Sequence, residues 1–458
     1  MRKTLATLLA AVFLYVVPFG PLSGTSQGMV ANPKFYTVAN PIPGRYVVVL
    51  ATTDLSPIAT PAPTQKSATP VDVTAAPAAL AISPDMNQVV IVAEPAPDPT
   101  VVATATALTS MYGGAFSTTW SNALKGFKLN STEPQAIAMS NDSRVAFVVQ
   151  DGAIVVGTPD TDPIGMTPDP VSFQNPQPNA SWGLDRIGQR ILPLDEKYAY
   201  QNDGTGVNAY VIDTGILPTH WEFQGRASAI YDAVDRENGG IDCNGHGSHV
   251  AGILGGQTFG VAKHVRLLGV RVLNCQGAGT WSDVIDGVNF VTWHSRQPAQ
   301  QGYPAVANMS LGGETNRACD AAVRNSIRSG VTYVVAAGNG NSDVSAYSPA
   351  GVSEAITVGA TNQSDARAEF SNYGPGLDLF APGVSIPSAW IGGDLMIATA
   401  SGTSMASPHV AGVVAQYLQN HRTASPAAVR SAVVGVSTAG VVINAGETSP
   451  NRLLFTNY

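Results

Sequence analysis

The order of apolar and polar residues changes character near Trp182. After it, short runs rich in β-branched residues alternate with segments in which apolar residues recur every three or four positions. The first pattern is typical of buried strands and the second of helices packed on a sheet. Strands are expected at 207–212, 267–273, 305–311, 331–337 and 355–360, and helices at 246–254, 282–294, 319–329 and 404–419. This alternation predicts an α/β unit with a mostly parallel sheet, spanning about 176–458.

The part of the chain before Trp182 is less regular and suggests a small α+β unit at 43–157. Strands are expected at 45–50, 145–149 and 154–156, and a helix at 100–111. A stretch rich in Pro, Ala, Thr and Ser, at about 54–98, has the composition of an inserted linker-like loop. The segment 158–175 is rich in Pro, Asp and Gly and has no periodicity, so it marks the boundary between the two units.

Composition and charge narrow the class of partner. Hydrophobic residues make up 44% of the chain and charged residues 12%, which fits a folded globular protein. The formal net charge is −8, and the sequence has no block of Lys and Arg. Nucleic acid and anionic membrane surfaces are therefore not expected as partners, whereas neutral soluble substrates are compatible with this charge.

Residues 1–28 have the pattern of a secretory signal. Arg2 and Lys3 precede an uncharged apolar run from Leu5 to Val17. A membrane anchor is the alternative, but this run of about 13 residues is shorter than the roughly 20 needed to span a bilayer. Secretion is expected, with signal cleavage among the small residues that follow Pro18.

Cysteine usage is compatible with an exported protein. Three cysteines, Cys243, Cys275 and Cys319, allow one disulfide and leave one thiol. An oxidising compartment permits such a bond. A zinc site is the alternative, but the cysteines lack the C-x-x-C spacing of zinc sites.

Two polar residues with catalytic potential lie at the ends of predicted elements. Asp213 directly follows the strand 207–212, where it is either a carboxylate at the active edge of the sheet or a residue that caps a turn. His246 stands between glycines at the start of an apolar helix and can face a cleft. A metal pair of His246 and His249 is the alternative, but H-x-x-H lacks the spacing and the glutamate of zinc hydrolases.

Two further residues supply the chemistry that such a pair lacks. Ser404 lies near the amino end of the helix 404–419, where free N–H groups and the helix dipole favour an oxyanion, although a plain N-cap serine is the alternative. Asn339 ends a buried strand and can donate to an oxyanion, or can simply occupy a turn between glycines. Pro408 removes a backbone donor early in the same helix, and the sequence offers no reason for it.

The order of these residues discriminates between classes of hydrolase. Asp213, His246 and Ser404 follow one another as Asp, His, Ser, whereas α/β-hydrolases have Ser, Asp, His and chymotrypsin-like enzymes have His, Asp, Ser. Ser404 also lies in Gly-Thr-Ser-Met-Ala and not in G-x-S-x-G. Subtilisin has this same order, so the chain is expected to be a serine endopeptidase that forms an acyl-enzyme on Ser404, with an esterase using the same nucleophile as an alternative.

With Asp213-Thr214-Gly215, the motif 244–249 and the motif 402–409 in this order, the chain resembles the subtilisin-like serine peptidases of family S8. The resemblance covers roughly Asn175 to the C-terminus and implies a three-layer fold, in which helices flank a mostly parallel sheet. Segments similar to the proteinase K and aqualysin branch are 182–187, 223–226, 347–350 and 370–374. Residues 43–157, with the segment 43–50 and Gly126-Phe127, are more weakly similar to the inhibitor propeptide (I9 type) of this family.

The resemblance implies roles in substrate binding. Asn339 would donate to the oxyanion, and Trp281 would line a more distant pocket or else pack in the core. Two segments would flank an extended substrate as neighbouring strands, which recognises any peptide: Gly277, Ala278 and Gly279, and Ser310, Leu311 and Gly312. The segments 310–313 and 336–338 carry small neutral side chains and no acid, so broad specificity with an apolar or aromatic residue before the cut is expected.

The resemblance also implies structural features. A calcium ion would bind Asp378 and the carbonyl oxygens of Ser353 and Ala355, a donor set that suits a hard cation. Cys243 and Cys275 match a disulfide of the aqualysin side of the branch, which leaves Cys319 without a partner. The second disulfide of the branch is missing, and Val250 stands where proteinase K has a cysteine, a difference that concerns stability.

Together these features imply a secreted, monomeric zymogen that cleaves itself within 157–179. Its partners would be protein or peptide substrates and its own propeptide, which would act as folding aid and inhibitor. A lasting complex, in which the N-terminal unit remains bound to the peptidase, is the alternative function from the binding class.

Overall fold

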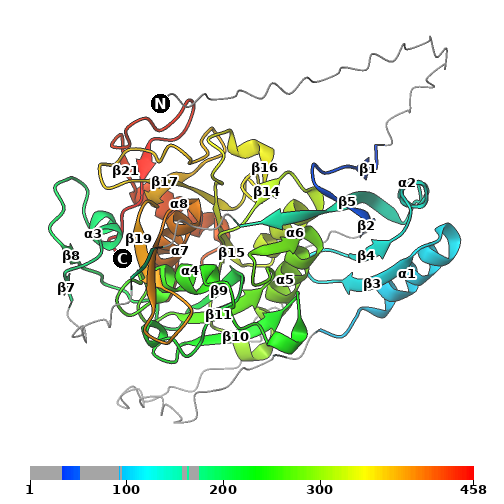
Figure 1. Cartoon of the computed structure of the whole chain (residues 1–458), viewed down its shortest axis with the longest axis horizontal. Coiled ribbons are helices and arrows are strands. Elements are labelled where there is room, and N and C mark those ends of the chain that lie inside the picture. The colour runs from blue at the N-terminus through cyan, green and yellow to red at the C-terminus, as the bar shows by residue number, and fades with distance from the viewer. Residues whose placement is uncertain (1–32, 52–91, 93–94, 157–161, 165–174) are drawn as a thin grey trace, which may run out of the picture. The chain divides into compact units, whose positions relative to one another are not determined.

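The computed structural model describes residues 33–51, 92, 95–156, 162–164 and 175–458 (Figure 1). The signal expected at 1–28, and most of the loop expected at 54–98 and of the linker expected at 158–175, lie outside these residues. Residues 34–458 form one unit by their contacts. Within the described part of the chain, no helix is both long and apolar enough to cross a membrane.

The largest sheet has nine strands and is parallel except at one edge. Its order is β10-β11-β9-β13-β15-β17-β18-β22-β21, and only the edge pair β21–β22 is antiparallel. The bounds are β9 Asn208–Asp213, β10 Ala227–Asp232, β11 Arg266–Arg271, β13 Ala305–Met309, β15 Thr332–Ala336, β17 Ile356–Thr361, β18 Leu379–Pro382, β21 Thr438–Ala439 and β22 Arg452–Leu453. The prediction of a mostly parallel sheet is confirmed, and the five expected strands begin and end within two residues of the observed bounds.

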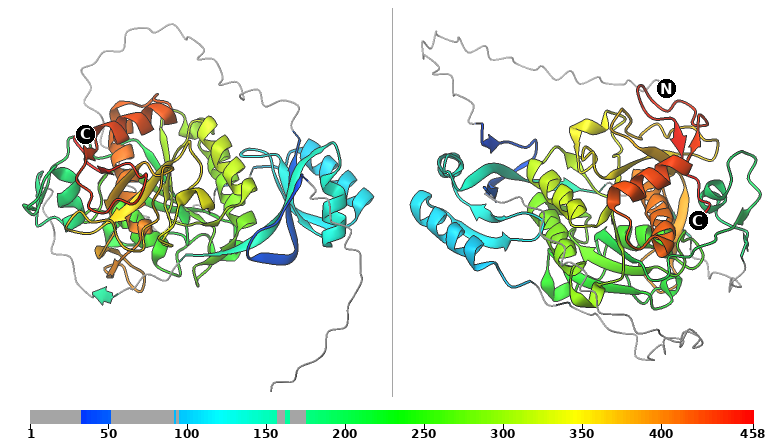
Figure 2. Two further views of the ribbon diagram at one scale, coloured as in Figure 1. Left: turned by 90° about the horizontal axis from the view of Figure 1, so that it is seen from above. Right: turned by 180° about the vertical axis from the view of Figure 1, so that it is seen from behind.

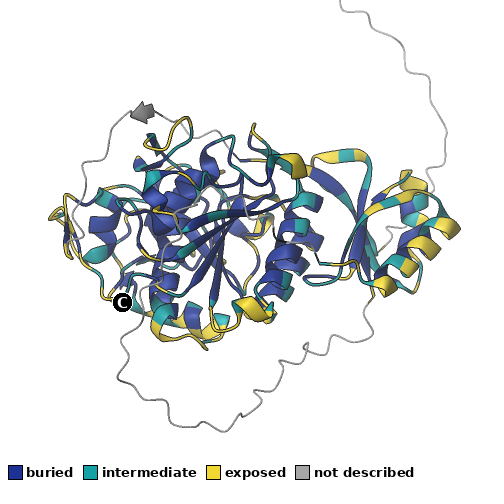
Figure 3. Cartoon of the chain, turned by 90° about the horizontal axis from the view of Figure 1, so that it is seen from below, coloured by how far each residue is buried: buried dark blue, intermediate teal, exposed yellow. Residues whose placement is uncertain are grey.

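Helices cover both faces of this sheet and make three layers (Figure 2). They are α3 Trp182–Gly188, α4 His246–Gly255, α5 Trp281–His294, α6 Arg317–Arg328, α7 Thr403–Asn420 and α8 Pro426–Val436. Successive strand residues point to opposite faces, so Ala209 and Val211 of β9 pack in a cluster with α4 and α7, whereas Tyr210 and Ile212 pack in a cluster with α5 and α6. The strands are therefore buried on both faces, as Figure 3 shows in dark blue.

A second sheet lies in the N-terminal part of the described chain. Its order is β1-β5-β2-β4-β3, from β1 Phe35–Tyr36, β2 Pro41–Leu50, β3 Ala115–Trp120, β4 Gly126–Asn130 and β5 Val145–Val155. Helices α1 Pro99–Tyr112 and α2 Glu133–Ser140 pack on it through a cluster that includes Val48, Leu108 and Met139. The two strands expected at 145–149 and 154–156 are wrong as separate elements, because β5 runs continuously through both.

Short elements complete the described chain. They are β6 Asp162–Ile164, β7 Gln177–Pro178, β8 Lys197–Tyr198, β12 Ala278–Thr280, β14 Gly313–Glu314, β16 Tyr347–Ser348, β19 Ile386–Ala389, β20 Ile397–Ala400, η1 Trp221–Phe223, η2 Arg236–Asn238, η3 Pro298–Gln300 and η4 Val344–Ala346. Of these, β12 matters most for the site, because it pairs with β5.

Candidate active site

Asp213 is the last residue of β9, at the carboxyl end of a strand inside the sheet. Its side chain is buried, and its Oδ1 accepts a hydrogen bond from Thr214 N at 2.7 Å. The chain turns at Gly215, which has a φ of +109°, and a Cβ there would lie 2.5 Å from the carbonyl oxygen of Gly240. Only glycine suits this turn, so the backbone itself places Asp213 at the sheet edge expected from the sequence.

His246 is the first residue of α4 and meets Asp213 directly. Its Nδ1–H donates to Asp213 Oδ1 at 2.7 Å, and both side chains are buried. Because a carboxylate only accepts, this bond leaves the neutral imidazole with an unprotonated Nε2. A Cβ at Gly247 would collide with the carbonyl oxygen of Gly215, so the close approach of α4 to the Asp213 turn requires a glycine after the histidine.

The charges around His246 raise its pKa above that of an ordinary histidine. Burial lowers the pKa of His246, but the charge of Asp213, the hydrogen bond to it and the charge of Asp242 outweigh burial, so the net pKa is raised. For His249, burial and then the charge of His246 lower the pKa to about 3. An imidazolium formed at His246 is therefore stabilised while its neighbour stays neutral.

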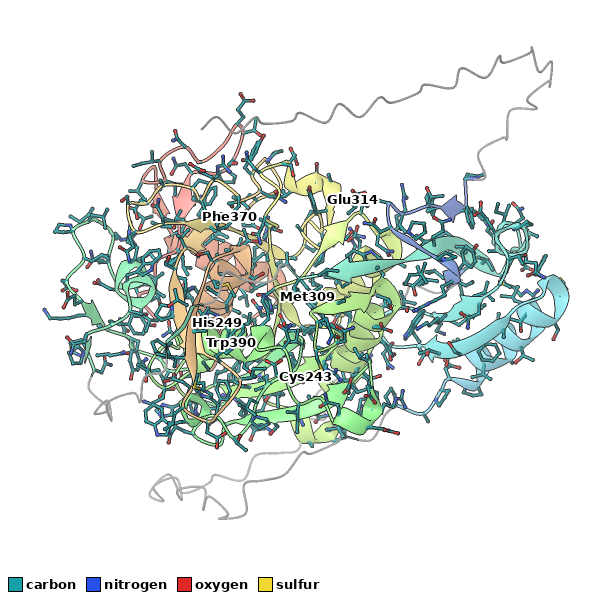
Figure 4. All side chains as sticks on the ribbon, viewed as in Figure 1. Cys243, His249, Met309, Glu314, Phe370 and Trp390 are labelled. Carbon is teal, nitrogen blue, oxygen red and sulfur yellow. A yellow bond between two sulfur atoms is a disulfide. The ribbon has the colours of Figure 1, made fainter. Side chains whose placement is uncertain are left out.

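The alternative metal pair of His246 and His249 is not formed. His249 Nε2 bonds the carbonyl oxygen of Ala398 at 3.1 Å, and its ring meets Trp390 edge to face (Figure 4). Among the residues that the structure describes, no three His, Cys, Asp or Glu side chains are grouped to hold a metal ion. His249 is a packed core histidine.

Ser404 is the second residue of α7 and is only partly buried. Its Oγ donates to the carbonyl oxygen of Ser310 at 3.1 Å, and no hydrogen bond joins it to His246 in the described part of the chain. Among the described residues the structure thus joins Asp213 and His246 by a hydrogen bond, but not His246 and Ser404. Such bonds are often long without substrate and form only in the complex.

Pro408 has a structural reason that the sequence did not reveal. Proline has no N–H, so it cannot donate to the carbonyl oxygen four residues earlier, which is that of Ser404. The hydroxyl of Ser310 donates to this oxygen instead, at 2.8 Å, and also contacts Ser407 Oγ at 2.9 Å. Because Pro408 leaves this carbonyl oxygen without a helical donor, Ser310 can bind it and connect the start of α7 to the residue just after β13.

The Asn339 amide has a fixed orientation beside Ser404. Its Oδ1 accepts hydrogen bonds from Thr403 N at 2.9 Å and Thr403 Oγ1 at 2.8 Å. Because a backbone N–H can only donate, the accepting atom must be the oxygen. The Nδ2 donor is therefore the opposite end of the amide, and it lies 3.4 Å from the position of a Cβ at Gly402, two residues before Ser404.

The segment expected to flank the substrate is paired with an extended chain. Ala278, Gly279 and Thr280 of β12 pair antiparallel with β5, and Val156 N donates to the carbonyl oxygen of Gly277 at 2.9 Å. The other expected segment, Ser310 to Gly312, follows β13 and contacts Ser404 through Ser310. Trp281 is 3% exposed and lies in one core cluster with Ile154 and Leu311, so it is both packed and adjacent to the paired chain.

The predicted disulfide is confirmed. Cys243 and Cys275 are bonded, with a Cα–Cα distance of 4.8 Å, and link the loop before α4 to the loop before β12 (Figure 4 labels Cys243). Cys319 is a free, buried thiol in α6, and burial raises its pKa well above the ordinary value. This cysteine acts as an apolar core residue.

The residues expected to bind calcium do not fit the ion as they are placed. Arg430 Nη2 lies 2.6 Å from Asp378 Oδ1, and Thr357 N donates to Asp378 Oδ2 at 2.9 Å. Both carboxylate oxygens thus have partners, and the guanidinium already supplies a positive charge beside Asp378. Asp378 is also the only carboxylate of the expected set, so Ser353 and Ala355 would add only neutral carbonyl oxygens.

The fold and the site together define a class, that of hydrolases with a serine, a histidine and an aspartate at one edge of a parallel α/β sheet. The sequence profile described as the subtilase family of S8 peptidases matches residues 204–453. The chain belongs to the subtilase family and is a subtilisin-like serine proteinase.

Individual relatives agree with this assignment. The chain is 49% identical to an extracellular serine proteinase of Thermus sp. strain Rt41A, over 76% of this chain and 79% of the relative. It is 46% identical to alkaline serine exoprotease A of Vibrio alginolyticus, over 76% of this chain and 62% of the relative. Among solved structures, a cold-adapted subtilisin-like serine proteinase aligns with a TM-score of 0.58 at 49% identity, covering 61% of this chain and 99% of that one.

Proposed function

We propose that the chain is a secreted serine endopeptidase of broad specificity, made as a zymogen, that hydrolyses peptide bonds through an acyl-enzyme on Ser404. The observation that carries the proposal is the buried 2.7 Å bond between His246 and Asp213, at the sheet edge where α7 presents Ser404. Casein hydrolysis by the purified chain, absent from a Ser404→Ala variant, is the direct test.

The proposed mechanism gives each of these side chains one role. His246 Nε2 takes the proton of Ser404 Oγ as the oxygen attacks the peptide carbonyl carbon. The peptide C–N bond then breaks, the leaving amine takes that proton from His246, and the acyl group stays on Ser404. Water, activated by His246, hydrolyses the ester. Asp213 holds the imidazole in the required tautomer and stabilises the imidazolium, and Asn339 donates to the oxyanion.

Replacing Asn339 tests the oxyanion donor. We expect Asn339→Ala to lower kcat about 100- to 1000-fold with little change in KM, because the donor acts on charge that develops only in the transition state. Asn339→Asp is the companion variant, since it keeps an Oδ1 acceptor for Thr403 and replaces the Nδ2 donor by a negatively charged oxygen. Steady-state kinetics on a peptide substrate are the measurement. Near-parental kcat in the Asp variant would show that Asn339 acts only by holding Thr403.

Specificity is proposed to be broad, with an apolar or aromatic residue before the cut. The segments 310–313 and 336–338 bring no acid to the site, and Leu311 is buried. In a panel of peptides that differ only at that position, we expect kcat/KM for Phe or Leu to exceed that for Arg or Lys by about tenfold or more, because an apolar pocket offers a buried cation no partner. Fastest cleavage after basic residues would overturn this specificity.

Synthesis as a zymogen is supported by the contacts of residues 43–157. The β5 strand lies along β12, one of the segments proposed to hold substrate. Asp151 accepts from Ser282 N at 3.0 Å at the start of α5, and Arg45 lies 2.7 Å from Asp151. Asn289 Oδ1 in turn accepts from Asn122 N at 2.8 Å. A propeptide bound in this way supports the peptidase fold and blocks substrate until self-cleavage within 157–179.

The same pairing of β5 with β12 favours one alternative function, a lasting complex in which the N-terminal unit stays bound. The zymogen and the lasting complex predict different products in the culture fluid. Mass spectrometry of an active preparation without residues 43–157 supports the zymogen, whereas an inactive species that retains them supports the complex.

The names of the extracellular relative from Thermus and of the exoprotease from Vibrio support secretion. Calcium at Asp378 is not part of the proposal, because Arg430 occupies that carboxylate.

A further inference from the structure

Asp242 carries a second buried carboxylate close to His246, in the loop before α4. The residue is 4% exposed. Its Oδ1 accepts hydrogen bonds from Thr214 Oγ1, Asn244 N and Gly245 N, each at 2.9 Å. Its Oδ2 accepts from Ser248 N at 2.8 Å and from Ser248 Oγ at 2.7 Å. All of these donors are neutral groups, so both oxygens are saturated by hydrogen bonds while the negative charge remains.

These bonds connect the two halves of the Asp213–His246 pair. Thr214 follows Asp213, and its Oγ1 accepts from Gly247 N at 2.9 Å while it donates to Asp242. Asn244, Gly245 and Ser248 surround His246 in the chain. Asp242 thus holds the turn that carries Asp213 and the helix start that carries His246 against each other. Asp213 itself is less fully bonded, because its Oδ2 has no hydrogen-bond partner within the described residues.

Asp242 also belongs to the small set of titratable groups that act on His246. Asp213 approaches from β9, Asp242 from the loop before α4, and His249 from one turn further along α4. His249 is uncharged at neutral pH, since its pKa is lowered to about 3. The two carboxylates are therefore the charges that stabilise an imidazolium at this position.

We infer that Asp242 is a positioning residue for His246, which fixes its distance from Asp213 and adds a second negative charge behind the base. This inference rests on the proposed function, because it assigns a means of tuning to the proposed general base. A merely structural role, as a cap of the helix start, would affect stability and leave the titration of the base unchanged.

The test compares pH profiles of kcat/KM for the parent and for Asp242→Asn. His246 must be neutral to accept a proton, so activity rises through its pKa. Removing a negative charge favours the neutral base, and we expect the acid limb of the Asn variant to move to lower pH by roughly 0.5 unit or more. We also expect kcat/KM at the optimum to fall about tenfold, because the amide cannot accept from Ser248 N. Asp242→Glu, which keeps the charge, should retain the parental acid limb.

Ser248→Ala is the matched control, because it removes one hydrogen bond to Asp242 and keeps the charge. Its acid limb should coincide with that of the parent. An Asn variant whose acid limb also coincides with the parent's overturns the inference. If the Asn variant does not fold, the inference is tested by NMR. The His246 ring is titrated in Ser404→Ala and in Ser404→Ala/Asp242→Glu. The ring pKa should be raised in both, and an ordinary histidine pKa in either contradicts the inference. Failure of the proposed function would look different, since the parent itself would then lack peptide hydrolysis.

Discussion

Ser404→Ala should lower kcat for peptide hydrolysis about a million-fold, the size of loss found when the serine of a subtilisin triad is removed. The reason is that Ser404 Oγ is the atom that forms the acyl-enzyme, so His246 and Asn339 have no covalent step to assist without it. The variant should also be recovered as an uncut chain, because self-cleavage would use the same nucleophile. Casein hydrolysis and the mass of the secreted product are the two measurements.

The control for this prediction lies directly before the motif 402–409. Ser401 Oγ accepts from Ser385 N at 2.8 Å and lies three residues before Ser404. Ser401→Ala should change kcat by no more than a few-fold, since surface substitutions away from the chemistry have small effects. A Ser404→Ala preparation that is processed and still digests casein would remove Ser404 as the nucleophile.

Much of the large sheet could be predicted because its strands are buried on both faces. Val211 and Ile212 of β9, like Val334 and Val335 of β15, must each be apolar whichever face they meet, and this leaves an uninterrupted apolar run. Edge and short elements give a weaker pattern. The strand β18 has four residues and ends in Pro382, and β10 is an edge strand, so neither was expected.

Gly152 shows how a local pattern can mislead. With Gln150 and Asp151 it separates the apolar residues of β5, where two strands were expected, although the strand continues through it. A Cβ at this residue would lie 3.2 Å from both the carbonyl oxygen of Asn40 and the ring of Trp281. A side chain at this position would press on its neighbours on both sides, and such packing depends on residues far away in the sequence.

The candidate site was predictable to the extent that it depends on chain order and on strand ends. Asp213 lies at the end of β9, His246 at the start of α4, and the expected disulfide is formed, whereas β15 ends at Ala336, three residues before Asn339. The supporting contacts were not predictable, since each joins segments that only the folded chain brings together. Ser310 reaches the Ser404 carbonyl across 94 residues, and Asp242 reaches Thr214 across 28. Arg430 at Asp378 is the same kind of contact, and it pairs with the carboxylate that was expected to bind calcium.

Asp213→Ala should lower kcat about ten-thousand-fold, less than the loss of Ser404 but far more than the loss of a turn cap. Asp213 Oδ1 accepts the Nδ1–H of His246, so without it the imidazole loses both its preferred tautomer and the charge that raises its pKa. The KM should change little, because Asp213 is buried behind His246 and does not reach the substrate. Steady-state kinetics with a peptide substrate give both constants.

Asp203 provides the matched control, since Asp203 Oδ2 bonds His264 Nδ1 at 2.8 Å at a partly exposed position. Asp203→Ala breaks an aspartate–histidine bond of nearly the same length, and kcat should stay within a few-fold of the parent. The alternative reading of Asp213, as a residue that caps the turn at Thr214, predicts a loss of stability with kcat nearly unchanged. Asp213→Asn separates charge from geometry, because an amide oxygen can still accept from Thr214 N and His246. If its kcat stays close to that of the parent, holding the ring is sufficient; a loss near that of Asp213→Ala shows that the negative charge behind His246 is what the reaction requires.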